Sequence, residues 1–201
     1  GTITTFAGNG SLSPVGDGGQ AIDAGFVFPS SVIVSTAGVM YIAETSGNRI
    51  RRVATNGVIT TVAGTGVGGN TGDGGPATLA TLLSPLALYL DAADNLFIAD
   101  AGNDRIRKVD ASGVISTFAG TGDIGFSGDG GAATDARLDA PSGIWGASDG
   151  TLYIADSSNN RLRKVDLNGV ISSVAGNGNT FFAGDGGPAT TARLQSPAAV
   201  A

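Results

Sequence analysis

The 201-residue chain contains no cysteine and no histidine, and only one of its 17 acidic residues is a glutamate. Without these side chains the protein cannot build a disulfide framework, a cysteine- or histidine-ligated zinc site or a Ser-His-Asp triad from its own residues. Basic residues are also scarce, because 11 Lys and Arg leave a net charge of −6. We therefore expect no nucleic-acid binding, which needs an excess of clustered cations to neutralise phosphates.

Long apolar runs are missing as well. No stretch approaches the roughly 18 consecutive apolar residues that indicate a membrane span, and no basic segment followed by an apolar one begins the sequence. The composition is nevertheless that of a folded protein, with 41% hydrophobic and 14% charged residues. Because Asp favours turns whereas Glu favours helix interiors, the excess of Asp predicts an all-β fold.

A period of 56 residues runs through the whole sequence. The tetrad Gly-Asp-Gly-Gly recurs at this step, and so do single prolines, glycines and arginines. These markers are Asp17, Asp73, Asp129 and Asp185; Pro29, Pro85, Pro141 and Pro197; Gly8, Gly64, Gly120 and Gly176; and Arg49, Arg105 and Arg161. No insertion breaks the register, so we interpret the chain as one repeat array with units at about 1–56, 57–112 and 113–168 and a partial unit at 169–201.

Four short strands are predicted in each period. In the second period, alternating apolar residues indicate strands at 87–90, 96–99, 105–109 and 114–119. Dipeptides such as Asn56-Gly57 predict two-residue turns with positive φ and therefore antiparallel hairpins. A Gly-rich connection then leads to the next unit. Such small sheets must stack to cover their faces, and the pattern favours a propeller of four-stranded blades over a linear solenoid.

The motifs resemble those of the NHL repeat β-propellers. Pro-Ser-Gly-Ile at 141–144, Leu-Tyr-Ile-Ala-Asp at 152–156 and Asn-Asn-Arg-Leu-Arg-Lys-Val at 159–165 follow the family pattern in order. The connector Gly-Asp-Gly-Gly-Pro-Ala-Thr, at 72–78 and 184–190, is similar to that of long bacterial and teneurin-type members. The resemblance implies a propeller that serves in binding or scaffolding. Related six-bladed propellers include lactonases and lyases, so the fold alone does not fix the activity.

The chain holds about 3.6 periods, whereas propellers typically have about four to eight blades. We expect a fourth-type strand at 3–7 and a first-type strand at 198–201, which gives an incomplete ring of three full blades with partial blades at its ends. Such an array is either a segment of a longer propeller or one part of a homo-oligomer that completes the ring. Alone, it would expose apolar faces and sheet edges.

The aspartates of the Gly-Asp-Gly-Gly loops are candidate calcium ligands. These residues are Asp17, Asp73, Asp129 and Asp185. Calcium takes roughly six to eight oxygen ligands, and no spaced acidic series supplies them. We favour a role in which each Asp accepts backbone N–H groups and fixes its turn, and we predict no cofactor. The G-x-G-x-x-G match at 64–69 lacks the following helix that a dinucleotide site needs.

Most of the basic residues fall in the predicted third strands. The nine are Arg49, Arg51, Arg52, Arg105, Arg107, Lys108, Arg161, Arg163 and Lys164. We predict that the first arginine of each group pairs with the carboxylate of the second strand and that the others face solvent. The predicted pairs are Arg49 with Glu44, Arg105 with Asp100, and Arg161 with Asp156. Binding of a polyanion along the bands of positive charge is the alternative.

Function can instead lie where the repeats differ. One first-strand position reads Ile33, Tyr89 and Trp145, and the connectors carry Phe126, Phe181 and Phe182 at variable positions. Large rigid side chains such as these anchor many protein interfaces. The alternative is that they pack between blades.

The sequence therefore favours a non-enzymatic scaffold for protein interaction or self-assembly. One alternative is a lactonase- or lyase-like enzyme whose active site lies in further blades, and another is a propeller that binds a ligand or polyanion. The Ser/Thr/Gly-rich, acidic and thiol-free composition suggests an extracellular or cell-surface protein of a bacterium.

Overall fold

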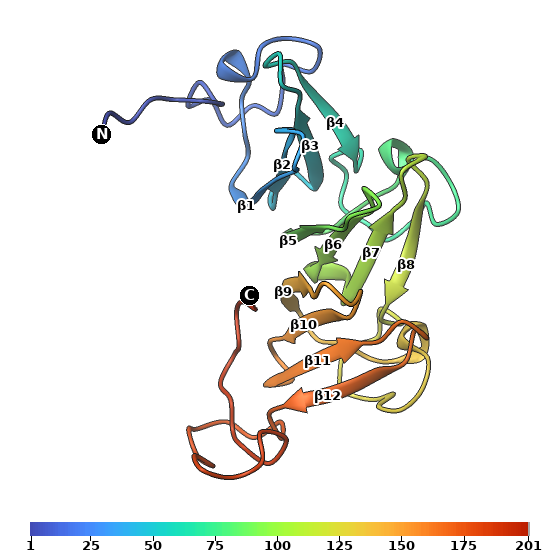
Figure 1. The fold of residues 1–201 in the computed structure, drawn as a ribbon. Coiled ribbons are helices and arrows are strands. Elements are labelled where there is room, and N and C mark those ends of the chain that lie inside the picture. The colour runs from blue at the N-terminus through green and yellow to red at the C-terminus, as the bar shows by residue number, and fades with distance from the viewer. Residues whose placement is uncertain (201) are drawn as a thin grey trace.

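Twelve strands form three separate four-stranded antiparallel sheets in a computed structural model that describes residues 1–200 (Figure 1). The strands of the first blade are β1 (Pro29–Val34), β2 (Met40–Glu44), β3 (Arg49–Val53) and β4 (Ile59–Ala63). Those of the second are β5 (Pro85–Leu90), β6 (Leu96–Asp100), β7 (Arg105–Val109) and β8 (Ile115–Ala119). Those of the third are β9 (Pro141–Gly146), β10 (Leu152–Asp156), β11 (Arg161–Val165) and β12 (Ile171–Ala175). The predicted all-β architecture of 56-residue blades is confirmed.

The blades stand in a curved row that does not close into a ring. Their first strands β1, β5 and β9 lie next to one another along the inner side, and β4, β8 and β12 lie on the outer side (Figure 1). The last residues of the described chain return to the inner side beside β9 (Figure 1). No helix among residues 1–200 has the length and apolar character needed to cross a bilayer.

The predicted hairpins are confirmed, but their turns are of another type. In the β3–β4 hairpin, the Gly57 N–H donates to the Ala54 carbonyl at 2.8 Å, and the Ala54 N–H donates to Val58 at 2.9 Å. Within this loop only Gly57 has a positive φ, of 82°. This is a three-residue loop with a bulge at its glycine, and not the two-residue turn that Asn-Gly predicted.

Two of the predicted strands are wrong. Residues 1–7 form no strand, and neither do residues 197–200, whereas Ala201 lies outside the described residues. A fourth-type strand pairs with a third-type strand, and no third-type strand lies beside residues 3–7 in the part of the chain that the structure describes.

The hydrophobic core lies between the blades. One cluster joins Ile50 of the first blade to Leu88 and Ile98 of the second, and an equivalent cluster joins Ile106 of the second blade to Ile154 of the third. Two short 3₁₀ helices in the connectors add buried alanines to these clusters: η2 (Ala77–Leu79) and η4 (Ala133–Asp135). A third, η1 (Ala21–Asp23), adds Ala21 to a separate cluster with Ile42 and Ile59 of the first blade. A further one, η3 (Ala101–Asn103), joins β6 to β7.

The residue before each of the recurring prolines Pro29, Pro85, Pro141 and Pro197 adopts a left-handed backbone conformation. The values of φ are 50° at Phe28, 50° at Ser84, 46° at Ala140 and 44° at Ser196. In the last three, the backbone N–H donates to a side chain at the start of the previous blade's third strand. These bonds are Ser84 to Asn48 at 2.9 Å, Ala140 to Asp104 at 2.7 Å and Ser196 to Asn160 at 2.9 Å. This strained junction therefore has a fixed partner in the preceding blade.

Replacing Leu138 by Ala tests the packing between blades. Leu138 is fully buried in the cluster between the second and third blades, so we expect the free energy of unfolding to fall by about 2–5 kcal/mol. The matched control is Leu194→Ala, one period later, where the side chain is partly exposed. Urea denaturation should show a clearly smaller loss for the control, and equal losses would contradict this account of the core.

Candidate functional site: an open groove between the first two blades

Each blade buries one arginine between two carboxylates. In the first blade, Arg51 Nη2 lies 2.6 Å from Asp17 Oδ1, and Arg51 Nη1 lies 2.9 Å from Glu44 Oε1. The equivalent contacts are Arg107 with Asp73 at 2.6 Å and Asp100 at 3.5 Å, and Arg163 with Asp129 at 2.7 Å and Asp156 at 3.2 Å. Asp17 belongs to the connector and Glu44 to β2, so the arginine joins each connector to the blade that follows it.

The predicted pairing of the first arginines is wrong. Glu44 does stand opposite Arg49 in the strand register, but the Arg49 guanidinium donates to the Gly47 and Pro14 carbonyls at 3.3 Å. Arg105 likewise donates to the Thr121 carbonyl, and Arg161 to the Asn177 carbonyl. Two residues further along each strand stand Arg51, Arg107 and Arg163, which were predicted to face solvent. They are fully buried, and they form the ion pairs with the carboxylates instead. A buried guanidinium must be paired, whereas the first arginine can reach connector carbonyls.

Three of the four connector aspartates, Asp17, Asp73 and Asp129, pair with these arginines, and the first two also accept hydrogen bonds from β4-type strands. Asp17 Oδ2 accepts the Thr61 N–H at 3.1 Å, and Asp73 Oδ2 accepts the Thr117 hydroxyl at 2.7 Å. Partial burial alone would raise the pKa of Asp17, but hydrogen bonds from Thr61 and Arg51 and the charge of Arg51 bring it below its ordinary value. Among residues 1–200, no three acidic side chains gather as metal ligands.

The second-strand carboxylates are buried and hold the ends of the connectors. Asp100 accepts the Leu83 N–H at 2.7 Å and the Asn103 amide at 2.8 Å. Burial raises the pKa of Asp100 to about 6, although these bonds and Arg107 oppose the shift. Burial also raises the pKa of Asp156.

The first blade carries a compensating pair of substitutions at this place. Glu44 replaces Asp, and Gly47 stands where the other blades have Asn103 and Asn159. A Cβ atom at Gly47 would lie 2.8 Å from Glu44 Oε2, so the longer carboxylate fills the space of the missing amide side chain. Glu44 Oε2 still accepts the Val27 N–H at 2.9 Å.

The structure separates the four aromatic candidates. Phe126 stacks on an arginine of the following blade, with the Arg161 Cζ atom 3.6 Å from the ring centroid. Trp145 packs against Tyr153, with ring centroids 5.9 Å apart. Phe181 and Phe182 are 73% and 79% exposed. These four residues do not form one patch with the arginines and carboxylates, and their role in binding stays a prediction.

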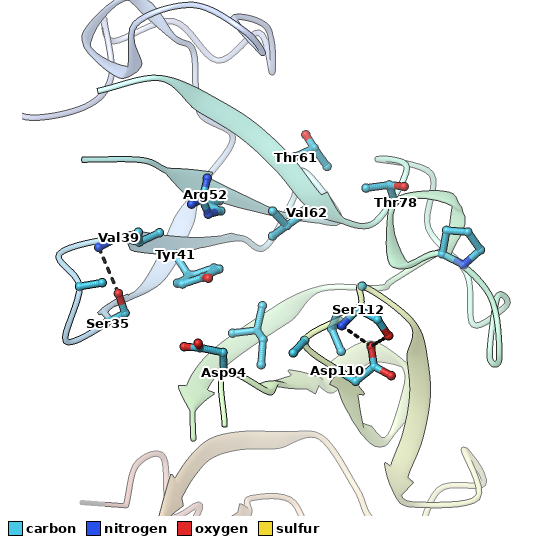
Figure 2. Close-up of a pocket in the computed structure, with 16 residues that line it drawn as sticks. Ser35, Val39, Tyr41, Arg52, Thr61, Val62, Thr78, Asp94, Asp110 and Ser112 are labelled. Carbon is cyan, nitrogen blue, oxygen red and sulfur yellow. Dashed lines mark hydrogen bonds between the residues drawn. The ribbon is translucent and has the colours of Figure 1, made fainter. Parts of the chain in front are cut away.

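A groove of about 570 Å³ lies between the first and second blades. Tyr41, Arg52 and Val62 belong to its first wall (Figure 2). Across the gap lie Asp94 and the turn that contains Asp110 (Figure 2). The buried residues Leu96 and Val109 also line this side of the groove. The sequence analysis did not predict this groove.

The equivalent groove between the second and third blades is largely filled. Its volume is about 230 Å³, and Tyr89, Phe97 and Phe118 stand where the first blade has Ile33, Tyr41 and Val62. Phe97 and Phe118 pack edge to face with centroids 5.0 Å apart, and a Cβ atom at Gly146 would overlap the Tyr89 ring. The sequence analysis singled out the variable position Ile33/Tyr89/Trp145, but not the differences between Tyr41 and Phe97 and between Val62 and Phe118.

The open groove carries charges that the protein does not neutralise. Arg52 and Asp94 form no ion pair within residues 1–200. Asp110 is engaged, since it accepts the Ser112 hydroxyl at 2.7 Å and two backbone N–H groups. The Ser112 hydroxyl and then the Val114 N–H hold the pKa of Asp110 below its ordinary value. The groove thus offers a guanidinium and a carboxylate on opposite walls, and the half-buried side chains of Tyr41 and Val62 add apolar surface.

Comparison with known proteins supports the architecture. The sequence model of one family, described as the teneurin NHL domain, matches residues 9–68 and 121–183, more than half of the chain. The chain belongs to this family. It is 39% identical to mouse Teneurin-1 over 103 residues, which cover 44% of this chain and 4% of that protein. It is 29% identical to Teneurin-3 of Danio rerio over 194 residues, which cover 87% of this chain and 6% of that protein.

Solved structures with the same fold include both binding proteins and enzymes. An auxiliary nutrient binding protein from Bacteroides ovatus superposes with a TM-score of 0.65 at 16% identity, over 89% of this chain and 44% of the other. A gluconolactonase from Xanthomonas campestris superposes with a TM-score of 0.54 at 14% identity, over 75% of this chain and 48% of the other. This NHL chain therefore spans less than half of each of these relatives, and at such identities the likeness shows the fold alone.

The buried Asp100 predicts an unusual dependence of stability on pH. Because its pKa is raised from 3.8 to about 6 in the folded state, its contribution is fully present below pH 4 and is lost as the pH rises towards 6. Comparing urea unfolding of the wild type with Asp100→Asn should show the wild type losing about 3 kcal/mol relative to the variant over this range.

Asp17→Asn is the matched control, since the pKa of Asp17 is lowered. The stability of the wild type relative to this variant should be present above pH 3.8 and fall as the pH drops below that value. Parallel pH profiles for the two variants would contradict the assignment.

Proposed function

We propose that this NHL protein is a non-enzymatic scaffold whose groove between the first and second blades binds an extended segment of a partner protein. The observation that carries the proposal is the contrast between two equivalent grooves in one chain, of about 570 and 230 Å³. The larger volume falls in the range of about 300–1,000 Å³ that is usual for ligand sites.

The chemistry of the walls specifies the segment. An acidic side chain would pair with Arg52, a basic side chain with Asp94, and an apolar residue between them would cover the half-buried Tyr41 and Val62. Hydrogen bonds to charged groups are stronger than neutral ones, so the two unpaired charges set the direction of the segment along the groove. Tyr41 and Val62 supply the apolar surface that binding would bury.

The repeated use of the buried charges supports a role without catalysis. The same carboxylate–arginine–carboxylate arrangement occurs in all three blades, whereas acid–base catalysis needs carboxylates in unlike environments. We also propose an extracellular or cell-surface setting, which the thiol-free, acidic composition supports. A bacterial source stays a prediction, since the teneurins above are animal proteins.

Filling the groove tests the proposal. Peptides would be selected from a displayed random library on the immobilised wild-type protein, and their affinities measured for Val62→Phe. This change places the ring of Phe118 at the equivalent site of the open groove, so we expect binding to weaken at least tenfold. The control is Val174→Phe, the same change two periods later and outside this groove.

Arg52→Ala adds a second readout, because it should weaken peptides with a conserved acidic residue more than those without one. Peptides that bind Val62→Phe as tightly as the wild type would contradict the proposed site. Turnover of a simple lactone in the presence of divalent metal ions would contradict a role without catalysis.

A further inference from the structure

The smaller pocket between the second and third blades has a lining unlike that of the open groove. Its volume is about 230 Å³, and it shares no lining residue with the groove between the first two blades. This volume lies below the range of about 300–1,000 Å³ that is usual for drug-sized ligands. The pocket therefore suits one small chemical group. Because the two sites are separate, binding here does not depend on the proposed function.

Three aromatic rings line the pocket from the second blade. They belong to Tyr89, Phe97 and Phe118. The centroid of the Phe97 ring lies 6.0 Å from that of Tyr89, with 40° between the ring planes, and 5.0 Å from that of Phe118, with 85° between the planes. The rings thus stand at different angles along one wall. The face of an aromatic ring carries partial negative charge and attracts cations.

Two carboxylates, those of Asp91 and Asp166, line the same pocket, whose lining within residues 1–200 contains no lysine or arginine. Neither carboxylate forms an ion pair in that part of the chain. Backbone groups of their own turns hold both in place. Asp91 Oδ1 accepts the Asn95 N–H at 2.8 Å, and Asp166 Oδ1 accepts the Val170 N–H at 3.0 Å. Burial, and then the charge of Asp91, raises the pKa of Tyr89. The lining is therefore negative as well as aromatic.

The third blade leaves this space open because it contributes small residues. Gly146 and Gly150 line the pocket and stand where the second blade has Leu90 and Asp94. Leu167 lines it as well, and its side chain is 77% exposed. Because Gly150 is also exposed, the pocket opens to solvent at this edge, beside the hairpin turns.

We propose that this pocket binds a methylated ammonium group, either of a free quaternary cation or of a methylated lysine side chain. The aromatic rings attract its charge, and Asp91 and Asp166 balance it. A quaternary ammonium has no N–H donor to satisfy, whereas a bare ammonium would leave donors unpaired against the aromatic wall. The methyl groups of the ligand also bury apolar surface against the rings and Leu167.

Lys108 lies near this site without lining it. Its Nζ atom lies 5.8 Å from the centroid of the Phe97 ring, so the chain already places one ammonium against this aromatic wall. A second cation in the pocket would be repelled by Lys108. Removal of the Lys108 charge should therefore strengthen binding.

Calorimetric titration of the full chain with choline chloride tests the proposal. The matched ligand is the neutral alcohol in which a tert-butyl group replaces the trimethylammonium group, because it keeps the shape and lacks the charge. We expect the alcohol to bind at least tenfold more weakly than choline. Equal affinities for the two ligands would overturn the inference.

A peptide with one trimethyllysine, compared with the same peptide carrying unmodified lysine, distinguishes the two sources of the group. Tighter binding of the methylated peptide than of choline assigns the pocket to a side chain of a partner, and the reverse order assigns it to a free cation. Absence of binding by both choline and the methylated peptide would overturn the inference.

Substitutions locate the site. Asp166→Asn should weaken choline binding at least tenfold, because it removes the charge and keeps the Oδ1 acceptor. The matched control is Asp110→Asn, the same change one period earlier and outside this pocket, and it should leave choline binding unchanged. Phe118→Val, which introduces the residue of the first blade, should also weaken binding, and Lys108→Gln should strengthen it.

Circular dichroism would check that these variants stay folded. If Asp166→Asn binds choline as tightly as the wild type, or if Asp110→Asn loses as much affinity as Asp166→Asn, the inference is overturned.

Discussion

The arrangement of blades and connectors depends on the ion pairs of the buried arginine in each blade. It takes one carboxylate from the connector and one from the second strand of its own sheet, as Arg51 does with Asp17 and Glu44. Two segments that are distant in sequence thereby share one desolvated charge. Removing either carboxylate leaves the guanidinium buried with less compensation, which is costly in a protein interior. Each connector is fastened to its blade by this requirement as well as by apolar burial.

The volume of the groove between neighbouring blades varies more than the structure of the blades themselves. Strand positions and hydrogen-bond register are the same in all three blades, so the width of each groove is set by the volume of a few side chains. The aromatic rings of Phe97 and Phe118 close one groove, and Tyr41 and Val62 leave the other open. The same strand framework therefore gives grooves of different volume within one chain.

The sequence predicts the framework well because the framework repeats. The strict 56-residue step, the alternating apolar residues and the hairpin dipeptides are sufficient for the twelve strands and their antiparallel order. The sequence alone does not show which arginine is buried. Arg49 and Arg51 lie on the same face of β3, and only the position of the connector decides between them. The open groove depends on side chains from two blades, and no local pattern records it. The compensation between Glu44 and Gly47 lies within one hairpin, and the alignment of the repeats shows both departures but not their contact.

The left-handed residue before the recurring proline links each unit of the array to the unit before it. Its conformation is unfavourable for residues other than glycine, and a following proline disfavours it further. The acceptor that holds Ser84 in this conformation is Asn48, which belongs to the blade before it. The Thr45 hydroxyl of the same blade donates to the Pro85 carbonyl at 2.9 Å, so the junction is held from both sides of the proline's peptide bond. A change at Asn48 would therefore be felt in the backbone of a segment 36 residues further along the chain.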